Sequence, residues 1–380
     1  MRIAFFTDAY LPTIDGVVIS ITNAAKMLAK KGHNVMLFAP TGGYLPDEMK
    51  KLGIKLYTLK SFELKSYKEY KIRIPTFSHV LKIARQFNPD IIHIHSPGGI
   101  GLEGIYCAKR LKVPVIATSH TVFSGFVKHV KLLGIEKMKF TEEVVWHLLR
   151  KFFNSCNAIV SPSQPMKDEL IAYGIEKPIY VISNGIDIKK FHIMDIKKKY
   201  DLVHVGRLSY AKNIDVVIKA LKILADKGIK PSLIIAGRGP EMKNLKNFSV
   251  SNKLNVKFLG AVSQEELVKI YNSAEIFITA STIETEGIVL LEAMACGKPI
   301  IAVNALAIPS VVKNNVNGLL SEPFDSKKIA RNIEKLLKNK SLRKKMSKKS
   351  AEFAKKYDLN IVNKQLENLY LSLIKQAKII

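Results

Sequence analysis

The sequence alternates short β-branched runs with helical patterns, and this alternation starts twice along the chain. The first start is a strand-like run at 2–6, a helical pattern from Ile19 to Lys31 that stops at Gly32, and a second run at 34–40. Further strands are predicted within 90–97 and 113–120, with a helix at 102–111 between them. Strands that alternate with helices in this way predict half of a parallel, doubly wound α/β domain.

The same pattern restarts near residue 180. Strands are predicted within 200–206, 231–239, 253–260, 274–281 and 298–304, and helices within 214–228, 265–273 and 287–296. At roughly 150 residues per domain, 380 residues predict two domains. We place them at 1–176 and 177–361, with a cleft between them. Ligands of open parallel sheets lie outside the carboxyl ends of the strands, so functional residues are expected in the loops there.

The chain is strongly basic, with 60 Lys and Arg against 32 Asp and Glu and a net charge of +28. This charge attracts an acidic partner without naming it. Zinc-finger spacing, an RNA-recognition signature and an obvious recognition helix are all missing from the sequence, so nucleic acid is not expected. Residues 326–356 contain 13 Lys and Arg and two acids, with apolar residues at near-helical intervals. They predict amphipathic helices whose basic face is either solvated or meets an acidic partner.

Cysteine usage and the apolar stretches predict a cytoplasmic protein. Cys107, Cys156 and Cys296 form no Cys-x-x-Cys pair, and their odd number suits a reducing compartment. The N-terminus reaches Asp8 before an apolar run typical of a signal peptide can form. The most apolar stretch, 288–309, contains charged residues and a proline, so no membrane-spanning segment is expected.

Four charged residues occupy the expected carboxyl-end loops of the second domain. Arg207 and Lys212 follow the strand at 200–206, and Glu284 and Glu292 are separated by seven residues. If a helix begins at Gly287, Glu284 precedes it and Glu292 lies one to two turns inside. The carboxylates of Glu284 and Glu292 would then contact successive parts of an elongated ligand.

A diphosphate fits the gap between these carboxylates. Backbone N–H groups of Gly287, Ile288 and Val289 would point at it, because a helix N-terminus offers unpaired donors and a favourable dipole. Arg207 and Lys212 would add a planar fork and a point charge on the same anion. Each charge alone is typical of a surface ion pair, whereas all four on these loops indicate a site.

These residues resemble the retaining glycosyltransferases of family 4, which have the GT-B architecture of two Rossmann-like domains facing across a cleft. The likeness covers nearly the whole chain. It is carried by the segments TDAYLPTIDGV, DIIHIHSP, VIATSHT, VISNGIDIKKF, HVGRLSYAKNID, LIIAGRGP, KFLGAVSQEEL and ETEGIVLLEAMACGKP. The resemblance implies an acceptor-binding N-terminal domain, completed by a last helix at 362–380, and a C-terminal domain that binds a nucleotide sugar.

The resemblance also implies residue roles. Arg207 and Lys212 would hold the diphosphate, Glu284 the hydroxyls of the donor sugar and Glu292 the ribose, with His120 near the reacting sugar. Gly16 would approach the diphosphate or the acceptor. The expected catalytic residues are His120, Arg207, Lys212 and Glu284. The expected donor-binding residues are Gly16, Gly206, Arg207, Lys212, Gly260, Glu284, Gly287, Ile288, Val289 and Glu292.

Two positions depart from the family pattern. Asp15 stands where many members have a glycine, and Glu286 replaces an apolar or aromatic residue and is expected to face solvent. Asn184 and Gly185 are interpreted as a turn.

No metal or cofactor is expected. His93 and His95 share a strand face without partners spaced as metal ligands, and no Asp-x-Asp occurs. Cations and helix N–H groups must then neutralise the leaving diphosphate.

The acceptor is the least determined part of the function. Residues 126–153 combine Lys and Arg with bulky apolar residues and Trp146, which is typical either of a membrane-interface segment or of core helices around an acceptor pocket. Together with the first loop and the HSP loop, they look most like diacylglycerol and phosphatidylinositol glycosyltransferases. We therefore expect a UDP- or GDP-hexose donor, a lipid acceptor and peripheral attachment to an anionic membrane. The alternatives are a soluble or polysaccharide acceptor, a sugar-nucleotide epimerase and a non-catalytic binder.

Overall fold

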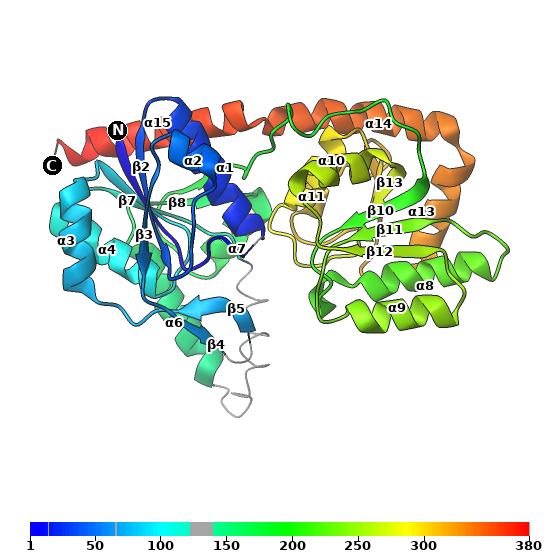
Figure 1. Cartoon of the computed structure of the whole chain (residues 1–380), viewed down its shortest axis with the longest axis horizontal. Helices are drawn as coiled ribbons and strands as arrows, with labels where there is room; N and C mark the ends of the chain where they lie inside the picture. The colour runs from blue at the N-terminus through cyan, green and yellow to red at the C-terminus, as the bar shows by residue number, and fades with distance from the viewer. Residues whose placement is uncertain (14, 65–66, 122–139, 380) are drawn as a thin grey trace. The chain divides into compact units, whose positions relative to one another are not determined.

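The structure is a computed structural model that describes residues 1–13, 15–64, 67–121 and 140–379. The chain divides into two compact units. Unit 1 consists of Met1–Asn184 and Leu359–Ile380, and unit 2 consists of Gly185–Asp358. Each unit contains its own parallel sheet and its own buried core, which confirms the predicted fold class (Figure 1).

Unit 1 is built on a seven-stranded parallel sheet in the order β3-β2-β1-β6-β7-β8-β9. Its strands are β1 (Arg2–Phe6), β2 (Asn34–Pro40), β3 (Lys55–Leu59), β6 (Ile91–Ile94), β7 (Val115–Thr118), β8 (Ala158–Ser161) and β9 (Ile179–Val181). The strands predicted near 2–6, 34–40, 90–97 and 113–120 are confirmed. From β1 the chain proceeds to β2 and β3 and then returns to β6, so the switch point lies between β1 and β6.

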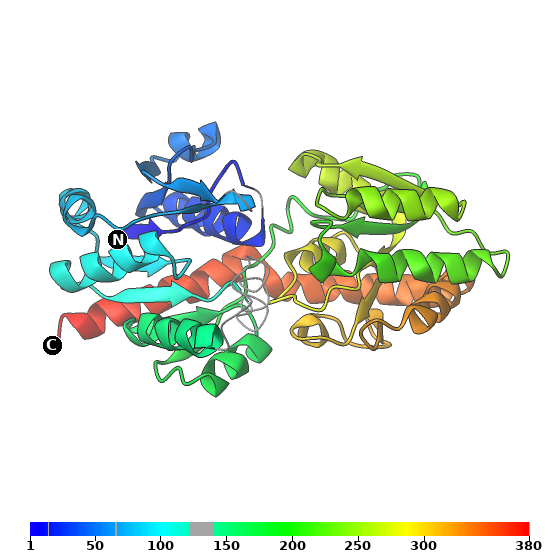
Figure 2. The ribbon, with the colours of Figure 1, turned by 90° about the horizontal axis from the view of Figure 1, so that it is seen from below.

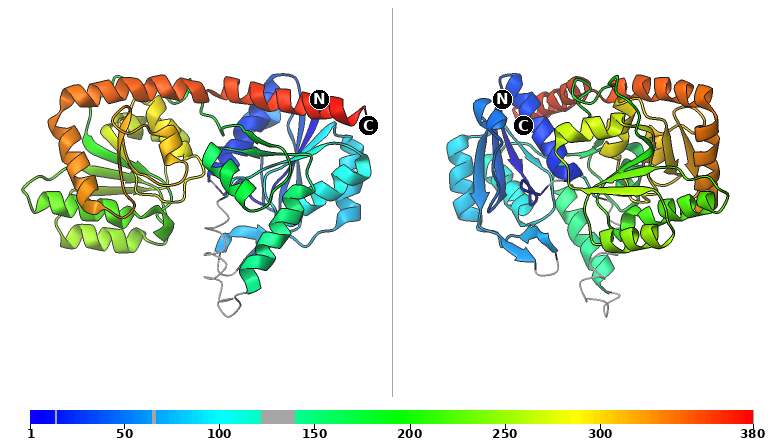
Figure 3. Two further views of the ribbon diagram at one scale, coloured as in Figure 1. Left: turned by 180° about the vertical axis from the view of Figure 1, so that it is seen from behind. Right: turned by 45° about the vertical axis from the view of Figure 1, so that its right-hand side comes forward.

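Helices cover the sheet of unit 1, and the last helix of the chain is one of them. They are α1 (Gly16–Lys30), α2 (Asp47–Lys51), α3 (Phe77–Phe87), α4 (Gly99–Leu111), α6 (Phe140–Asn154), α7 (Gln164–Ala172) and α15 (Leu359–Ala377). Helix α15 lies beside α1 (Figure 3). Leu366 and Leu369 of α15 share a core with Ile21 and Leu28 of α1. Helices α3 and α4 pack against each other (Figure 2).

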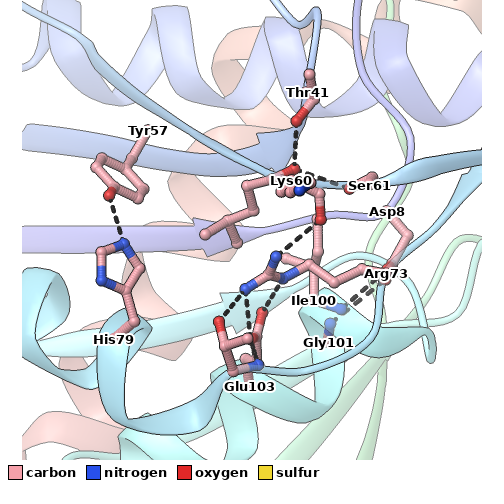
Figure 4. Close-up of polar contacts among 12 residues, drawn as sticks. Asp8, Thr41, Tyr57, Lys60, Ser61, Arg73, His79, Ile100, Gly101 and Glu103 are labelled. Carbon is pink, nitrogen blue, oxygen red and sulfur yellow. Dashed lines mark hydrogen bonds and ion pairs between the residues drawn. The ribbon is translucent and has the colours of Figure 1, made fainter.

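An antiparallel hairpin of β4 (Phe62–Leu64) and β5 (Tyr67–Ile72) precedes α3 and is anchored by a buried ion pair. Arg73 donates to both oxygens of Glu103 on α4, at 2.8 and 2.9 Å (Figure 4). Gly99 permits this approach, because a Cβ there would lie 2.2 Å from the Arg73 carbonyl oxygen. The segment after the hairpin is therefore fixed on α4.

The chain's own carboxylates cap both helices at the switch point of unit 1. Asp8 accepts from the backbone N–H groups of Ile100 and Gly101 in α4, at 2.9 and 3.3 Å. Asp15, the departure from the family pattern, accepts from Val18 N in α1 at 2.9 Å. Since a carboxylate at a helix N-terminus satisfies its donors and complements its dipole, these two helix ends are already occupied.

Unit 2 has a six-stranded parallel sheet in the order β12-β11-β10-β13-β14-β15. Its strands are β10 (Tyr200–Val205), β11 (Leu233–Ala236), β12 (Val256–Gly260), β13 (Ala274–Ile278), β14 (Ile300–Val303) and β15 (Gly318–Ser321). Its helices are α8 (Ile214–Ala225), α9 (Met242–Ser251), α10 (Gln264–Asn272), α11 (Ile288–Ala295), α12 (Ile308–Val311), α13 (Ser326–Lys338) and α14 (Lys340–Ala354). The predicted basic amphipathic helices are α13 and α14, which bury Ile329, Ile333, Leu336 and Met346.

Within the described ranges, no helix combines the length and the apolar character needed to cross a bilayer.

Candidate functional site

The predicted anion-binding residues gather at the switch point of unit 2. Strand β10 lies between β11 and β13, so the connections from β10 and β13 leave in opposite directions and open a crevice outside their carboxyl ends. The loop after β10 carries Arg207 and Lys212, and the loop after β13 carries Glu284. Two segments far apart in the sequence thus meet where ligands of this fold bind.

Lys212 and Glu284 form an ion pair, with Nζ 2.6 Å from Oε1. Their side chains are 23% and 12% exposed. Asn213 ties the two loops together, because its Nδ2 donates to Ala280 O and to Thr282 Oγ1, each at 3.2 Å. Arg207 is exposed at the start of the same loop.

The Glu284 carboxylate is held in its charged form. Burial disfavours the charge, but the Lys212 ammonium, which also donates a hydrogen bond to the carboxylate, outweighs burial and holds the pKa of Glu284 below its ordinary value. The nearby His204 is buried, and burial lowers its pKa to about 4, so the ring is neutral at physiological pH. Lys212 is therefore the cation that faces Glu284.

A helix begins beside this ion pair, as the sequence predicts. Gly287 is the N-cap of α11 with a φ of 85°, a left-handed conformation that favours glycine. As a glycine, the N-cap residue has no side chain with which to cap this helix end. The first N–H groups of α11, from Ile288 and Val289, are donors of the kind that bind anions. The helix end of unit 2 thus differs from the capped helix ends of unit 1.

Glu292 lies inside α11 and is only 3% exposed. The Tyr271 hydroxyl donates to its Oε2 at 2.7 Å. Burial raises the pKa of Glu292 to about 7, although Tyr271 and Lys190 both oppose this rise. The sequence gives no hint of Tyr271, since a tyrosine on the inner face of α10 is indistinguishable from an ordinary core residue.

Gly206 and Gly260 meet through a third glycine that the sequence analysis missed. A Cβ on Gly237 would lie 1.8 Å from the Gly206 carbonyl oxygen, and Gly237 N donates to Gly260 O at 2.7 Å. The loops that follow β10, β11 and β12 can therefore pack closely only because residue 237 is a glycine, which has no side chain.

The expectation that Glu286 faces solvent is wrong. Its side chain is 1% exposed, and its charge adds to the effect of burial in raising the pKa of Tyr357. The loop between β13 and α11 turns Glu286 into unit 2, while Glu284, two residues earlier, meets Lys212.

Two predicted residues, Gly16 and His120, belong to unit 1. Gly16 is the first residue of α1, directly after the cap Asp15. His120 follows β7, and its Nε2 lies 3.1 Å from His95 Nδ1. Burial lowers the pKa of His120 to about 4, against a hydrogen bond with Asn184. Asn184 therefore has a partner in His120, beyond its expected turn.

The predicted membrane-interface segment is described only in part, because residues 126–139 lie outside the described residues. The remainder falls on α6, where Trp146 stacks on Tyr173 with ring centroids 3.6 Å apart. Phe152 and Phe153 are buried in the unit 1 core, whereas Leu148 is exposed. This part of the segment packs as a core helix with an apolar residue on its outer side.

Taking only those residues that the structure describes, no group of three or more His, Cys, Asp or Glu side chains has the arrangement of a metal-ligand set.

Comparisons with known proteins agree on one family. Residues 187–353 match the model of glycosyl transferases group 1, and residues 14–190 match that of glycosyltransferase family 4. The α-monoglucosyldiacylglycerol synthase of Streptococcus pneumoniae is 31% identical over 337 residues, which cover 84% of this chain and 75% of that protein.

Two further comparisons concern the donor and the fold. A GDP-mannose-dependent α-mannosyltransferase of Corynebacterium glutamicum is 29% identical, over 86% of this chain and 78% of the relative. The crystal structure of Anabaena HepE in complex with UDP has a TM-score of 0.79 at 20% identity and covers 98% of this chain and all of that one. This structural likeness shows the fold.

Proposed function

The chain belongs to the group 1 glycosyltransferases of family 4, and we propose that it transfers a hexose from a nucleotide-diphosphate sugar to a membrane lipid, with retention and without a metal ion. The observation that carries this proposal is the Lys212–Glu284 ion pair beside the N-terminus of α11. The pair places a cation and a carboxylate beside the first N–H groups of α11, around one point of the crevice.

The diphosphate of the donor occupies this point. Its oxygens accept from the first N–H groups of α11, and Lys212 and Arg207 supply the opposing charge. As Lys212 turns to the diphosphate, Glu284 becomes available to accept from hydroxyls of the hexose. These cations act where negative charge develops on the leaving group, which is usually a large contribution to catalysis.

Glu292 holds the ribose of the nucleotide. Tyr271 occupies one carboxylate oxygen, which leaves the other to accept from ribose hydroxyls. The carboxylate must be ionised to accept from two hydroxyls, and its raised pKa makes this contact dependent on pH.

Transfer breaks the bond between the anomeric carbon and the diphosphate and forms one between that carbon and the acceptor oxygen. The acceptor hydroxyl gives its proton to the departing phosphate oxygen on the same face of the sugar, which retains the configuration. The name of the GDP-mannose-dependent α-mannosyltransferase supports retention, because GDP-mannose is itself α-linked. His120 contributes from unit 1 as a neutral hydrogen-bonding group for the hexose.

A lipid acceptor is supported by an exposed apolar patch on unit 1, formed by Phe62, Ile72, Ile74 and Phe77. Phe62 and Ile72 are opposite each other on the β4–β5 hairpin. Arg73 points inward to Glu103, so its neighbours Ile72 and Ile74 point outward, and Ile74 is 69% exposed. The buried Arg73–Glu103 ion pair thus keeps the apolar side chains of this patch exposed to solvent. Burial of the patch in a bilayer would remove this apolar surface from water.

The surroundings of this apolar patch suit an anionic bilayer. Residues 60–88 contain seven Lys and Arg and two acids. On α4, the Arg110 guanidinium lies 5.2 Å from the centre of the Tyr106 ring, which in turn lies 4.9 Å from the Phe77 ring. Each cation near an anionic leaflet contributes about 1 kcal/mol to attachment.

A screen of donors and acceptors tests the proposed function. The protein is incubated in EDTA with UDP- and GDP-hexoses, and nucleoside diphosphate release is measured with diacylglycerol-containing anionic vesicles, with soluble glycans and without acceptor. We expect release from one donor that rises with the vesicles. Release that rises only with a glycan would overturn the lipid acceptor, and conversion of the donor sugar without acceptor would indicate an epimerase.

Attachment through the apolar patch is tested separately with a fluorescent label. All three native cysteines are buried, so Ile74→Cys provides a selective site for an environment-sensitive dye. Val250→Cys in unit 2, at a residue 77% exposed, is the matched control. We expect anionic vesicles to shift the emission to the blue at position 74 alone, and salt to reverse the shift. Equal responses at both positions would rule out this surface.

A further inference from the structure

Three histidines of unit 1 lie together in its interior. His93 lies in β6 and His95 directly follows that strand, and their ring centroids are 4.0 Å apart. The His95 and His120 ring centroids are 5.4 Å apart, with an angle of 21° between the ring planes. The proposed function gives a role to His120 only. His93 and His95 are buried titratable groups beside it whose purpose the sequence does not reveal.

His93 is fully partnered and links two elements. Its Nδ1 lies 2.6 Å from the Tyr370 hydroxyl of α15, and its Nε2 lies 2.6 Å from Thr118 Oγ1 of β7. Both ring nitrogens of His93 therefore have hydrogen-bond partners within the core. His93 links α15 to β7.

In the hydrogen bond between His95 Nδ1 and His120 Nε2, one nitrogen must carry a proton and the other must accept it. A neutral imidazole carries a single N–H. His95 Nδ1 faces His120 Nε2, whereas His95 Nε2 is buried and has no hydrogen-bond partner among the described residues. A buried N–H group without a partner costs more than a bare ring nitrogen, so His95 carries its proton on Nδ1 and donates to His120 Nε2. His120 then carries its own proton on Nδ1.

The bare nitrogen of His95 lies in a place suited to a single water molecule. His95 Nε2 is buried, and none of the residues that the structure describes hydrogen-bonds it. His95 lines a cavity of about 30 Å³ together with Ser20 of α1, Asn184 and Asn363 of α15. A cavity of this volume with polar walls accommodates one water molecule.

We infer that this cavity binds one water molecule that donates to His95 Nε2, and that His95 is a positioning residue that fixes the proton of His120 on Nδ1. The second part rests on the proposed function only in assigning His120 to the hexose. The water and the tautomers follow from hydrogen-bond geometry within unit 1.

Nitrogen-15 NMR of the histidine-labelled full chain tests the tautomers without any enzymatic assay. We expect His95 in the Nδ1–H form and His120 with a bare Nε2. Protonation of His95 on Nε2 would overturn the inference. Tyr370→Phe is the matched control, because it removes a partner of His93 and should leave the His95 and His120 tautomers unchanged. Ala24→Val, which narrows the same cavity, should shift the His95 Nε2 resonance.

Three substitutions of His95 test the positioning role. His95→Asn keeps an N–H group near the position of Nδ1, and His95→Gln places its amide near the position of Nε2. His95→Leu has no hydrogen-bonding group at either position. His95→Leu and His95→Gln each lose the hydrogen bond to His120, so we expect both to lower kcat about tenfold with little change in the donor KM. His95→Asn should keep most of the wild-type kcat. Equal losses in all three, or rescue by Gln instead of Asn, would overturn the role. If no transfer is found with any substrate, the NMR result still decides the inference.

Discussion

The Lys212 ammonium lies 2.6 Å from the Glu284 carboxylate, although the two residues come from loops after different strands. The pair is mostly shielded from water, so its charges interact more strongly than an exposed pair would. In the protein without substrate each neutralises the other. In the proposed mechanism, a donor diphosphate competes with Glu284 for Lys212 and frees Glu284 when it binds.

Lys212→Ala should lower kcat by about 10²–10³-fold, because a preorganised charge is lost at the leaving group. Lys219→Ala is the matched control, since Lys219 pairs with Asp215 on the exposed side of α8 in the same unit. Steady-state kinetics with the preferred donor measure both variants. Similar kcat values for the two would mean that Lys212 does not act on the diphosphate.

The donor KM should fall as pH rises through about 7, because Glu292 then becomes an ionised acceptor for the ribose. Tyr271→Phe removes a hydrogen bond that lowers the pKa of Glu292, so the inflection should move to higher pH. Glu292→Gln should abolish the inflection. An unchanged inflection in Glu292→Gln would assign the pH dependence to another group.

Glu292 should also make unit 2 less stable as pH rises. Its folded pKa of about 7 exceeds its ordinary value of 4.5, so the folded state binds more protons between these values. The free energy of unfolding should therefore fall between about pH 4.5 and 7, and Glu292→Gln should flatten that part of the profile. Denaturant unfolding followed by hydrogen exchange in α11 measures this effect.

Gly287→Ala should weaken donor binding more than it weakens the fold. Position 287 has a φ of 85°, and an added Cβ would lie 2.8 Å from a Leu290 side-chain carbon. Gly32→Ala is a matched control, because Gly32 has a φ of 84° with open space around it, at the end of α1. Each costs about 1 kcal/mol of backbone strain, and calorimetric titration with UDP or GDP should show lost affinity only for Gly287→Ala.

Arg73→Met should destabilise unit 1 by about 3–5 kcal/mol, because it leaves the Glu103 carboxylate buried without its cation. Arg2→Met, which breaks the partly exposed pair of Arg2 with Asp90, should cost about 1 kcal/mol or less. The single tryptophan, Trp146, belongs to unit 1 and reports its unfolding by fluorescence. Equal losses in the two variants would contradict the anchoring of the hairpin on α4.

The sequence predicts the central strands well, because their β-branched runs are buried on both faces. The edge strand β3 escapes such analysis, since KLYTL is only partly buried and its pattern is mixed. The β4–β5 hairpin depends on Arg73, which meets Glu103 thirty residues later. Pairings between distant segments leave no periodic signal.

Some residues of the candidate site can likewise be predicted from the sequence, and others cannot. Charges on carboxyl-end loops and a glycine at a helix start are visible as patterns, and Lys212, Glu284 and Gly287 can be proposed from them. Tyr271 and Gly237 act through tertiary contacts that no local spacing indicates. The sequence favours solvent for Glu286, whereas the path of the loop between β13 and α11 buries it.

Proton NMR of the reaction in EDTA, with the preferred nucleotide hexose and diacylglycerol-containing vesicles, distinguishes a retained from an inverted linkage. We predict that an α-linked glycolipid forms, with nucleoside diphosphate released in equal amount, and that Lys212→Ala abolishes most of this product. A β-linked product, or transfer that begins only when a divalent cation replaces EDTA, would contradict this prediction.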